Sequence, residues 1–176
     1  VGENGLKELE TLCWVLDICN AKVNDSCGFH VHMDAAGFNL DTWKNLTLTY
    51  KHLEHLIDAF MPRTRRNNTY CKTLSGVSDE RIKSVRTIDG LREVFNNDRY
   101  HKVNFEAYSR HRTVEFRQHS GTTNFTKMEN WIRFLNGLIT FAKRSSLPSR
   151  MTLEELPFLD GKQKLFFKLR TKKLAV

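Results

Sequence analysis

The sequence lacks any long apolar segment. No run of hydrophobic residues approaches the roughly 20 that a helix needs to cross a bilayer, so we expect no membrane span. A charged-then-apolar leader is also missing after Val1, and the sequence therefore gives no sign of a targeting segment. Together these absences predict a cytoplasmic location.

Cysteine is scarce. The chain has four cysteines and no CxxC pair, which argues against a structural zinc site and leaves too few thiols for a disulfide framework at 176 residues. Cys13 and Cys19 fall on or near an apolar helical stripe. We therefore predict that both are buried thiols in a reducing compartment.

Acidic residues are absent from residues 161–176. This stretch carries six of the chain's eight net positive charges, on Lys162, Lys164, Lys168, Arg170, Lys172 and Lys173. Such a stretch can contact nucleic acid, an anionic membrane or an acidic partner, but it is more often a solvated extension. We assign residues 146–176 to a basic C-terminal extension and do not expect a nucleic-acid partner.

What is present indicates a globular protein, with 40% hydrophobic and 11% aromatic residues. Apolar residues at three- and four-residue steps predict helices over residues 4–19, 41–60, 78–85, 88–96 and 126–142. Period-two patterns predict strands over residues 29–34, 102–106 and 112–119, the last two forming a hairpin. We therefore expect an α+β fold over residues 1–145, with an antiparallel sheet and packed helices.

Two details of the helices can be predicted. The apolar stripe of the first helix consists of Leu6, Leu9, Leu12, Cys13 and Leu16. Asp41 precedes the stripe of the second helix, and its carboxylate is suited to cap the helix N-terminus.

Two predicted strands carry reactive side chains on one face. His30, His32 and Asp34 alternate with apolar residues in the first, as Glu115, Arg117 and His119 do in the last. If the strands are neighbours, one surface gathers groups able to bind a divalent cation, phosphate or protons. The alternative is a structural cluster of ion pairs on an exposed sheet face. The shared pattern in both strands favours the functional interpretation.

These segments, in their order along the chain, resemble the amidoligase family, whose members are related to glutamine synthetase. Residues 27–34 (CGFHVHMD) are similar to the family's CG-[FL]-H-V-H segment, and residues 113–122 (TVEFRQHSGT) to its T-[IV]-E-F-R-x-H-x-G-T segment. Residues 99–104 (RYHKVN) resemble an RYxxVN stretch, and residues 66–71 (RNNTYC) an Arg/Asn-rich loop. The resemblance implies that residues 1–145 are the C-terminal part of a glutamine synthetase-like catalytic domain.

The resemblance also implies a chemistry. Members would use ATP with Mg²⁺ or Mn²⁺ to phosphorylate a carboxylate, and an amine would then displace phosphate to form an amide or isopeptide bond. The substrates would be amino acids, peptides or proteins. His30 and Glu115 would hold the metal, while His32, Asp34 and Arg117 would face the nucleotide phosphates. Arg117 and His119 would take part in catalysis, and the implied substrate-binding residues are Arg66, Asn68, Lys102 and Asn104.

One part of the family pattern is not found in the sequence. Family members carry a G-x-E-x-E strand before the helix that leads into H-x-H, and its glutamates hold metal ions. Glu8 and Glu10 have that spacing but lie in a helical pattern, where residues two apart point in different directions. We expect an upstream segment or a separate chain to complete the sheet, and a piece without it to be inactive.

Two other functions remain open at this point. The sequence from His30 to Asp34 superficially matches the H-x-H-x-D-H motif of metal-dependent hydrolases, although Ala35 stands where the last histidine would be. The basic stretch and the run from Arg63 to Arg66 would also fit a non-catalytic module for polyanions. Glu115 and Asp34 argue against that module, because they repel phosphate in the absence of a cation.

Overall fold

The fold is known from a computed structural model, which describes residues 2–149 and 151–175. The elements are α1 (Gly2–Ile18), β1 (Gly28–Asp34), α2 (Leu40–Ala59), η1 (Arg63–Arg65), α3 (Asp79–Ser84), α4 (Ile88–Val94), β2 (Val103–Asn104), α5 (Ala107–His111), β3 (Thr113–Ser120), α6 (Phe125–Ala142), η2 (Leu153–Glu155) and α7 (Gly161–Leu174). The mixture of helices with one small antiparallel sheet confirms the predicted α+β fold. Among the helices described, none combines the length and the apolar character needed to cross a membrane.

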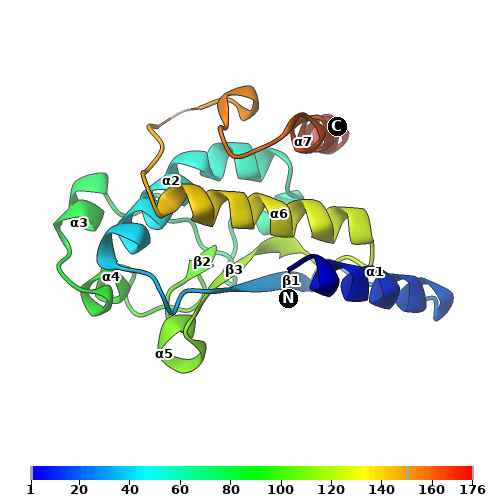
Figure 1. Ribbon diagram of the computed structural model, residues 1–176, viewed down its shortest axis with the longest axis horizontal. Helices are drawn as coiled ribbons and strands as arrows, with labels where there is room; N and C mark the ends of the chain where they lie inside the picture. The colour runs from blue at the N-terminus through cyan, green and yellow to red at the C-terminus, as the bar shows by residue number, and fades with distance from the viewer. Residues whose placement is uncertain (1, 150, 176) are drawn as a thin grey trace.

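The sheet has the order β1-β3-β2, and both pairs of neighbouring strands are antiparallel. Helices α2 and α6 pack against each other on one side of this sheet, and α7 lies beyond them (Figure 1). The core fills the space between the sheet and α2 and α6, where Val114 and Phe116 of β3 are fully buried. The opposite face of the sheet is left to polar side chains.

Helix α2 follows the prediction closely. The side chains of its apolar stripe are each at most 2% exposed, as expected for a helix packed against the sheet. They are Trp43, Leu46, Tyr50, Leu53, Ile57 and Phe60. The predicted cap was wrong: Asn39 is the N-cap, and its side-chain oxygen accepts a hydrogen bond from the Thr42 backbone N–H at 2.8 Å. Asp41 lies inside the first turn instead, where its negative charge favours the helix dipole.

The hairpin of β2 and β3 is confirmed, but a short helix occupies its turn. Helix α5 ends at Arg112, which adopts a left-handed conformation with φ of 57°. The guanidinium group of Arg112 covers the Tyr108 ring at 4.2 Å, and this cation–π contact compensates part of the cost of the unusual backbone.

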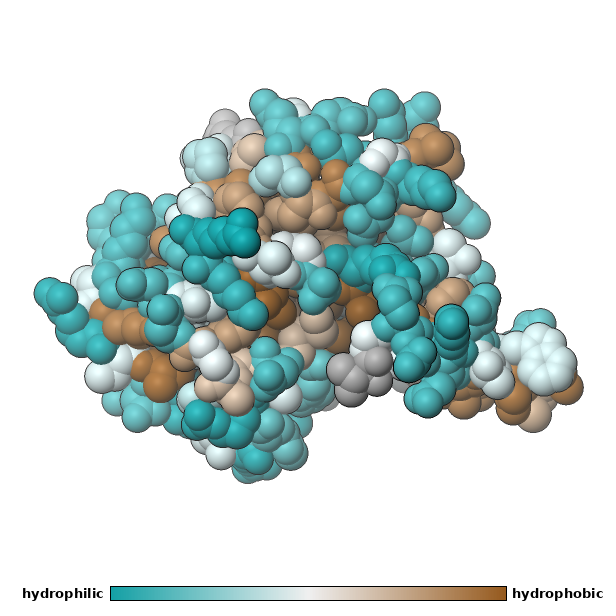
Figure 2. Space-filling model, in the orientation of Figure 1, coloured by the Kyte–Doolittle hydropathy of each residue, from teal (hydrophilic) through white to brown (hydrophobic). Residues whose placement is uncertain are grey.

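Helix α1 is confirmed as a helix, but its predicted stripe is only partly buried. Cys13 packs on α6 with its Sγ 3.6 Å from the Met128 Sδ, whereas Leu12 is 52% exposed. Trp14 and Ile18 are exposed as well, and the C-terminal half of α1 projects from the body with hydrophobic residues on its surface (Figure 2). Cys19 lies at this end and is exposed, so the prediction that it is buried was wrong.

The basic stretch is not simply a solvated extension. Leu156, Leu159 and Phe167 are buried, and the Phe167 ring centroid lies 4.4 Å from that of Phe60 at the end of α2. Arg170 donates from Nε to the Phe60 carbonyl oxygen at 2.8 Å. One face of α7 is therefore anchored on the core that contains the end of α2, while its lysines are on the outer side.

Candidate active site

One polar side chain from each of the three strands lies in a row across the sheet. His32 of β1 pairs with Glu115 of β3, and Glu115 pairs with Asn104 of β2 on its other side. Because residues directly opposite each other in a sheet project to the same face, the register brings all three together on the face away from α2 and α6. His30 and Arg117 join them from the next positions on the same face.

Glu115 is the centre of this cluster. Its Oε1 lies 3.0 Å from His30 Nδ1, 3.7 Å from His32 Nε2 and 2.9 Å from Arg117 Nη1. Its Oε2 accepts a hydrogen bond from Asn104 Nδ2 at 2.6 Å. Burial alone would raise the pKa of Glu115, but the hydrogen bonds from His30 and Asn104 and the charge of Arg117 outweigh it and lower the pKa to about 2. The carboxylate is therefore charged at every physiological pH.

The two histidines face the solvent more than their partners do. The His30 and His32 side chains are 34% and 42% exposed, whereas those of Glu115 and Arg117 are 6% exposed. The Nδ1 of His32 lies 2.8 Å from the Thr113 hydroxyl, which fixes the ring so that Nε2 faces Glu115. A buried anion thus lies below two accessible imidazoles.

An open cleft of about 410 Å³ begins at this cluster. His32, Asn104 and Glu115 form one wall. The other lining residues come from α4, from the loop before β2, and from α5 with its N-cap Glu106: Arg92, Asn97, Arg99, Glu106, Ala107, Ser109, Arg110 and His111. The His111 ring meets the His32 ring edge to face at 5.8 Å. No sequence pattern pointed to Arg110 and His111, because both lie in the predicted turn of the hairpin. Arg99 was notable only as the first residue of the RYxxVN stretch.

His119 does not share the face of Glu115 and Arg117, and that prediction was wrong. The register has an irregularity between Phe29 and Val31: Phe29 pairs with His119 but Val31 with Phe116, so β3 holds one extra residue there. This bulge turns His119 to the helix side, where its ring centroid is 5.7 Å from that of Trp131. Burial lowers the pKa of His119 to about 4, although Nδ1 contacts the Ser120 carbonyl oxygen.

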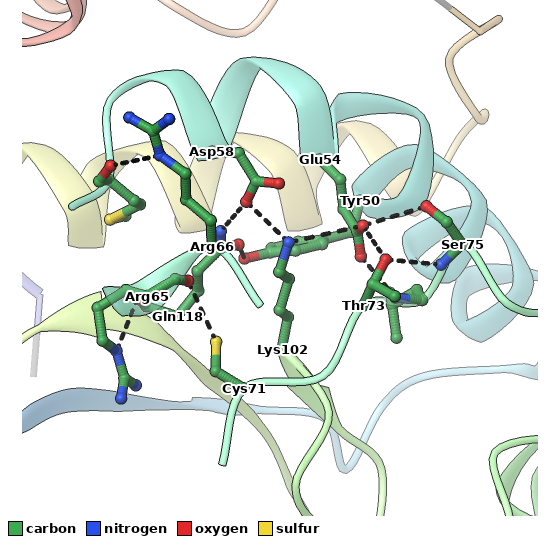
Figure 3. A network of polar contacts seen from close by, with 12 residues as sticks. Tyr50, Glu54, Asp58, Arg65, Arg66, Cys71, Thr73, Ser75, Lys102 and Gln118 are labelled. Atoms are coloured by element: carbon green, nitrogen blue, oxygen red, sulfur yellow. Dashed lines mark hydrogen bonds and ion pairs between the residues drawn. The ribbon is translucent and has the colours of Figure 1, made fainter. Parts of the chain in front are cut away.

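Lys102 also points away from the cluster. Its Nζ lies 2.7 Å from Asp58 and 3.6 Å from Glu54, both on α2, in a buried network that also includes Tyr50 and Gln118 (Figure 3). Lys102 precedes the two-residue strand β2, so the alternation that places Asn104 beside Glu115 does not extend to it. The geometry gives Lys102 a structural role, tying the sheet to α2.

Asp34, Arg66 and Asn68 are likewise not drawn into the cluster. The Asp34 carboxylate accepts from the Ala36 backbone N–H at 3.0 Å, which uses it in the turn after β1. Arg66 donates to the Met61 carbonyl oxygen at 3.0 Å, and Asn68 forms a local turn with the Tyr70 N–H at 2.7 Å. The neighbouring Arg65, which belongs to the basic run considered for polyanion binding, is only 4% exposed and donates to the carbonyl oxygens of residues 117 and 118. Arg65 thereby holds the bulge of β3.

A metal site formed by protein groups alone is not seen in the part of the chain that the structure describes, because no three His, Cys, Asp or Glu side chains there are arranged to hold an ion. What the cluster offers is one buried carboxylate with two imidazoles nearby, and Arg117 already neutralises that carboxylate. These groups fit a divalent ion most of whose ligands come from groups outside the cluster.

A comparison with known protein families identifies the family of the chain. The family model described as "Putative amidoligase enzyme" matches residues 2–139. The chain therefore belongs to the amidoligase family, a family of ligases, and both chemistry-bearing strands lie inside the matched region. Searches of curated proteins and of solved structures found no match.

Proposed function

We propose that the protein is an ATP-dependent carboxylate–amine ligase and that the cluster around Glu115 is the site of phosphoryl transfer. The observation that carries this proposal is the pairing of His32 with Glu115, with His30, Asn104 and Arg117 around the same carboxylate at the mouth of a cleft. Membership of the amidoligase family supports the formation of an amide.

The proposed reaction has two steps. A carboxylate oxygen of the substrate attacks the γ-phosphorus of ATP, the bond to the ADP oxygen breaks, and an acyl phosphate forms. The nitrogen of an amine then attacks the acyl carbon; the C–N bond forms, the bond to phosphate breaks, and the amine proton leaves to solvent or to a nearby base. Catalysis of this kind depends on positioning and on charge neutralisation, which fixed cationic groups supply.

The residues of the cluster have distinct roles in this proposal. Glu115 and His30 would hold Mg²⁺ or Mn²⁺, which would take its other ligands from nucleotide phosphates and water and neutralise phosphate charge. His32, whose side chain is 42% exposed beside Glu115, would contact the nucleotide phosphates. Arg117 is fixed by Glu115 and by the Tyr70 carbonyl oxygen, with its guanidinium carbon 5.5 Å from the centre of the Tyr100 ring, and supplies positive charge beside the transferred group.

The edges of the sheet support a further part of the proposal. In the described residues β1 and β2 are the outer strands, and each has a side that no strand covers. Unpaired strand edges are suited to pair with another strand. We propose that a strand from an upstream segment or from another chain joins one of them and brings further carboxylates to the metal.

A metal-dependent hydrolase receives less support from the same site. That chemistry needs Asp34 to join His30 and His32 as a set of three ligands, but no three His, Cys, Asp or Glu side chains in the described residues are arranged to hold an ion.

The proposal predicts that Glu115→Gln weakens the binding of ATP in the presence of Mn²⁺. We expect at least a tenfold increase in Kd, because the substitution replaces the carboxylate ligand of the metal with a neutral amide while keeping the shape of the side chain. Isothermal titration calorimetry on the full-length protein measures this.

Glu80→Gln is the matched control, since Glu80 is exposed in the first turn of α3, outside the cleft, and its loss changes the net charge equally. It should leave the affinity for ATP unchanged. Equal affinities of wild type and a folded Glu115→Gln variant, or tight zinc binding with no affinity for ATP, would contradict the ligase.

A further inference from the structure

The charges in the cleft are not balanced. Arg92 is neutralised by Glu106 and by Asp89, and Glu115 by Arg117. Arg99 and Arg110 also line the cleft, are exposed, and have no carboxylate partner in the part of the chain that the structure describes. Two cations therefore face a cavity whose other wall is the proposed phosphoryl-transfer site.

Both arginines are placed by features of the local backbone. Arg99 follows Asn96 and Asn97, which adopt left-handed conformations with φ of 58° and 50°, and its guanidinium carbon lies 5.6 Å from the centre of the Tyr100 ring. Arg110 belongs to the last turn of α5. A guanidinium group offers a planar pair of donors to a carboxylate, so each is suited to bind one anionic group.

The shape and lining of the cleft restrict the ligand further. Its volume of about 410 Å³ exceeds what a single carboxylate needs. Apart from Ala107 its lining side chains are polar, so no Leu, Ile, Val, Phe, Tyr or Trp side chain is present to cover a purine base. A small and highly polar anion fits this lining better than a nucleotide does.

We infer that the cleft is the site of the carboxylate substrate, and that this substrate carries a second carboxylate, which Arg99 and Arg110 bind. The reacting carboxylate lies at the end formed by His32, Asn104 and Glu115, and the second is held at the other end. This inference rests on the proposed ligase function for the role of the ligand, and it makes Arg99 and Arg110 the residues that determine specificity.

The test compares two probes of similar length, glutarate with two carboxylates and butyrate with one. Their binding to the full-length protein at low ionic strength is followed by NMR shifts of the backbone N–H groups of the residues that line the cleft, without ATP or metal. We expect glutarate to bind at millimolar concentration, and Arg99→Gln with Arg110→Gln to weaken it at least tenfold. Butyrate should bind more weakly and respond little to the substitutions.

Arg86→Gln is the control, because Arg86 is exposed and lies outside the cleft. The inference is overturned if butyrate binds as well as glutarate, if Arg86→Gln weakens glutarate equally, or if glutarate does not bind. It is also overturned if inorganic triphosphate displaces glutarate through Arg99 and Arg110, which would assign the cleft to nucleotide phosphates. If the protein binds ATP but not glutarate, this inference is contradicted and the proposed ligase function is not. If it binds glutarate but not ATP, the proposed ligase function is contradicted.

Discussion

At the scale of single residues, two side chains with shifted pKa values lie on opposite faces of one strand. Glu115 is held charged on the polar face, and His119 is held neutral on the helix side by its burial against Trp131. The extra residue in β3 separates these environments. The polar pair of Glu115 and Arg117 was predictable from alternation, but the position of His119 was not, because a bulge leaves no mark in the period-two pattern before the strands are paired.

His119 should make the protein sensitive to mild acid. Its pKa is about 4 in the folded protein and about 6.5 when it is unfolded, so between these values the unfolded chain binds more protons. Stability should therefore be fully present above pH 6.5 and decline as the pH falls toward 4, by up to about 3 kcal/mol from this group. Urea unfolding at pH 7, 5.5 and 4 measures the decline.

The comparison that isolates this residue uses His119→Gln, which should show a much shallower decline over the same pH range than the wild type does. His111→Gln should behave as the wild type does, since His111 is exposed. A His119→Gln protein with an undiminished pH dependence would show that other groups are responsible.

At the scale of the elements, the ends of β1 and β3 are held at unusually close range. Gly121 donates its N–H to the Cys27 carbonyl oxygen at 2.8 Å, and a Cβ on Gly121 would lie 2.4 Å from the Cys27 Cβ and 3.1 Å from that oxygen. This contact fixes the register just beyond the bulge, and so it also fixes which residues of β3 reach the cluster.

Gly121→Ala should destabilise the protein by about 1–3 kcal/mol, because backbone atoms of the facing strand would have to move. Gly5→Ala is the matched control: Gly5 lies inside α1 with nothing within 4 Å of the added Cβ, so this change should be neutral or slightly stabilising. Chemical denaturation gives both values. A stable Gly121→Ala protein would mean that the strands separate here at little cost.

The element scale also shows where prediction from sequence succeeds and where it ends. The stripe of α2 and the two faces of β1 were predictable, because both follow from periodicities that a packed layer enforces. Lys102 was assigned to the substrate site only through the family resemblance, and the sequence does not show that its side chain reaches Asp58 and Glu54 of α2 instead. Arg99 and Arg110 reach the cleft through the loop before β2 and through α5, and only the three-dimensional arrangement shows that these segments meet His32.

At the scale of the whole molecule, the structure extends beyond the region that defines the family. The family model ends at residue 139, but Phe167 of α7 packs against Phe60 and Phe134. The boundary predicted at residue 145 therefore does not separate independent cores, because side chains from both sides of it contact each other.

Phe167→Ala should cost about 3–5 kcal/mol, the usual effect of removing a buried phenylalanine. Leu165→Ala in the same helix should change stability by less than about 0.5 kcal/mol, since Leu165 is 57% exposed. Thermal unfolding followed by circular dichroism should show one transition for all three proteins. A separate early transition confined to α7 would instead make residues 146–176 an independent unit.

The pairing of β1 with β3 has a consequence for how the protein is made. His32 and Thr113, which contact each other in this pair, are 81 residues apart in the sequence. Contacts of such long range form slowly, since the entropy of closing a long loop is lost before any pairing compensates it. A chain emerging from the ribosome can form α2 early, but its two reactive strands must wait until residue 120 is free. The side chains around Glu115 are therefore brought together only when the sheet itself is complete, and no chain that ends before β3 carries them as a cluster.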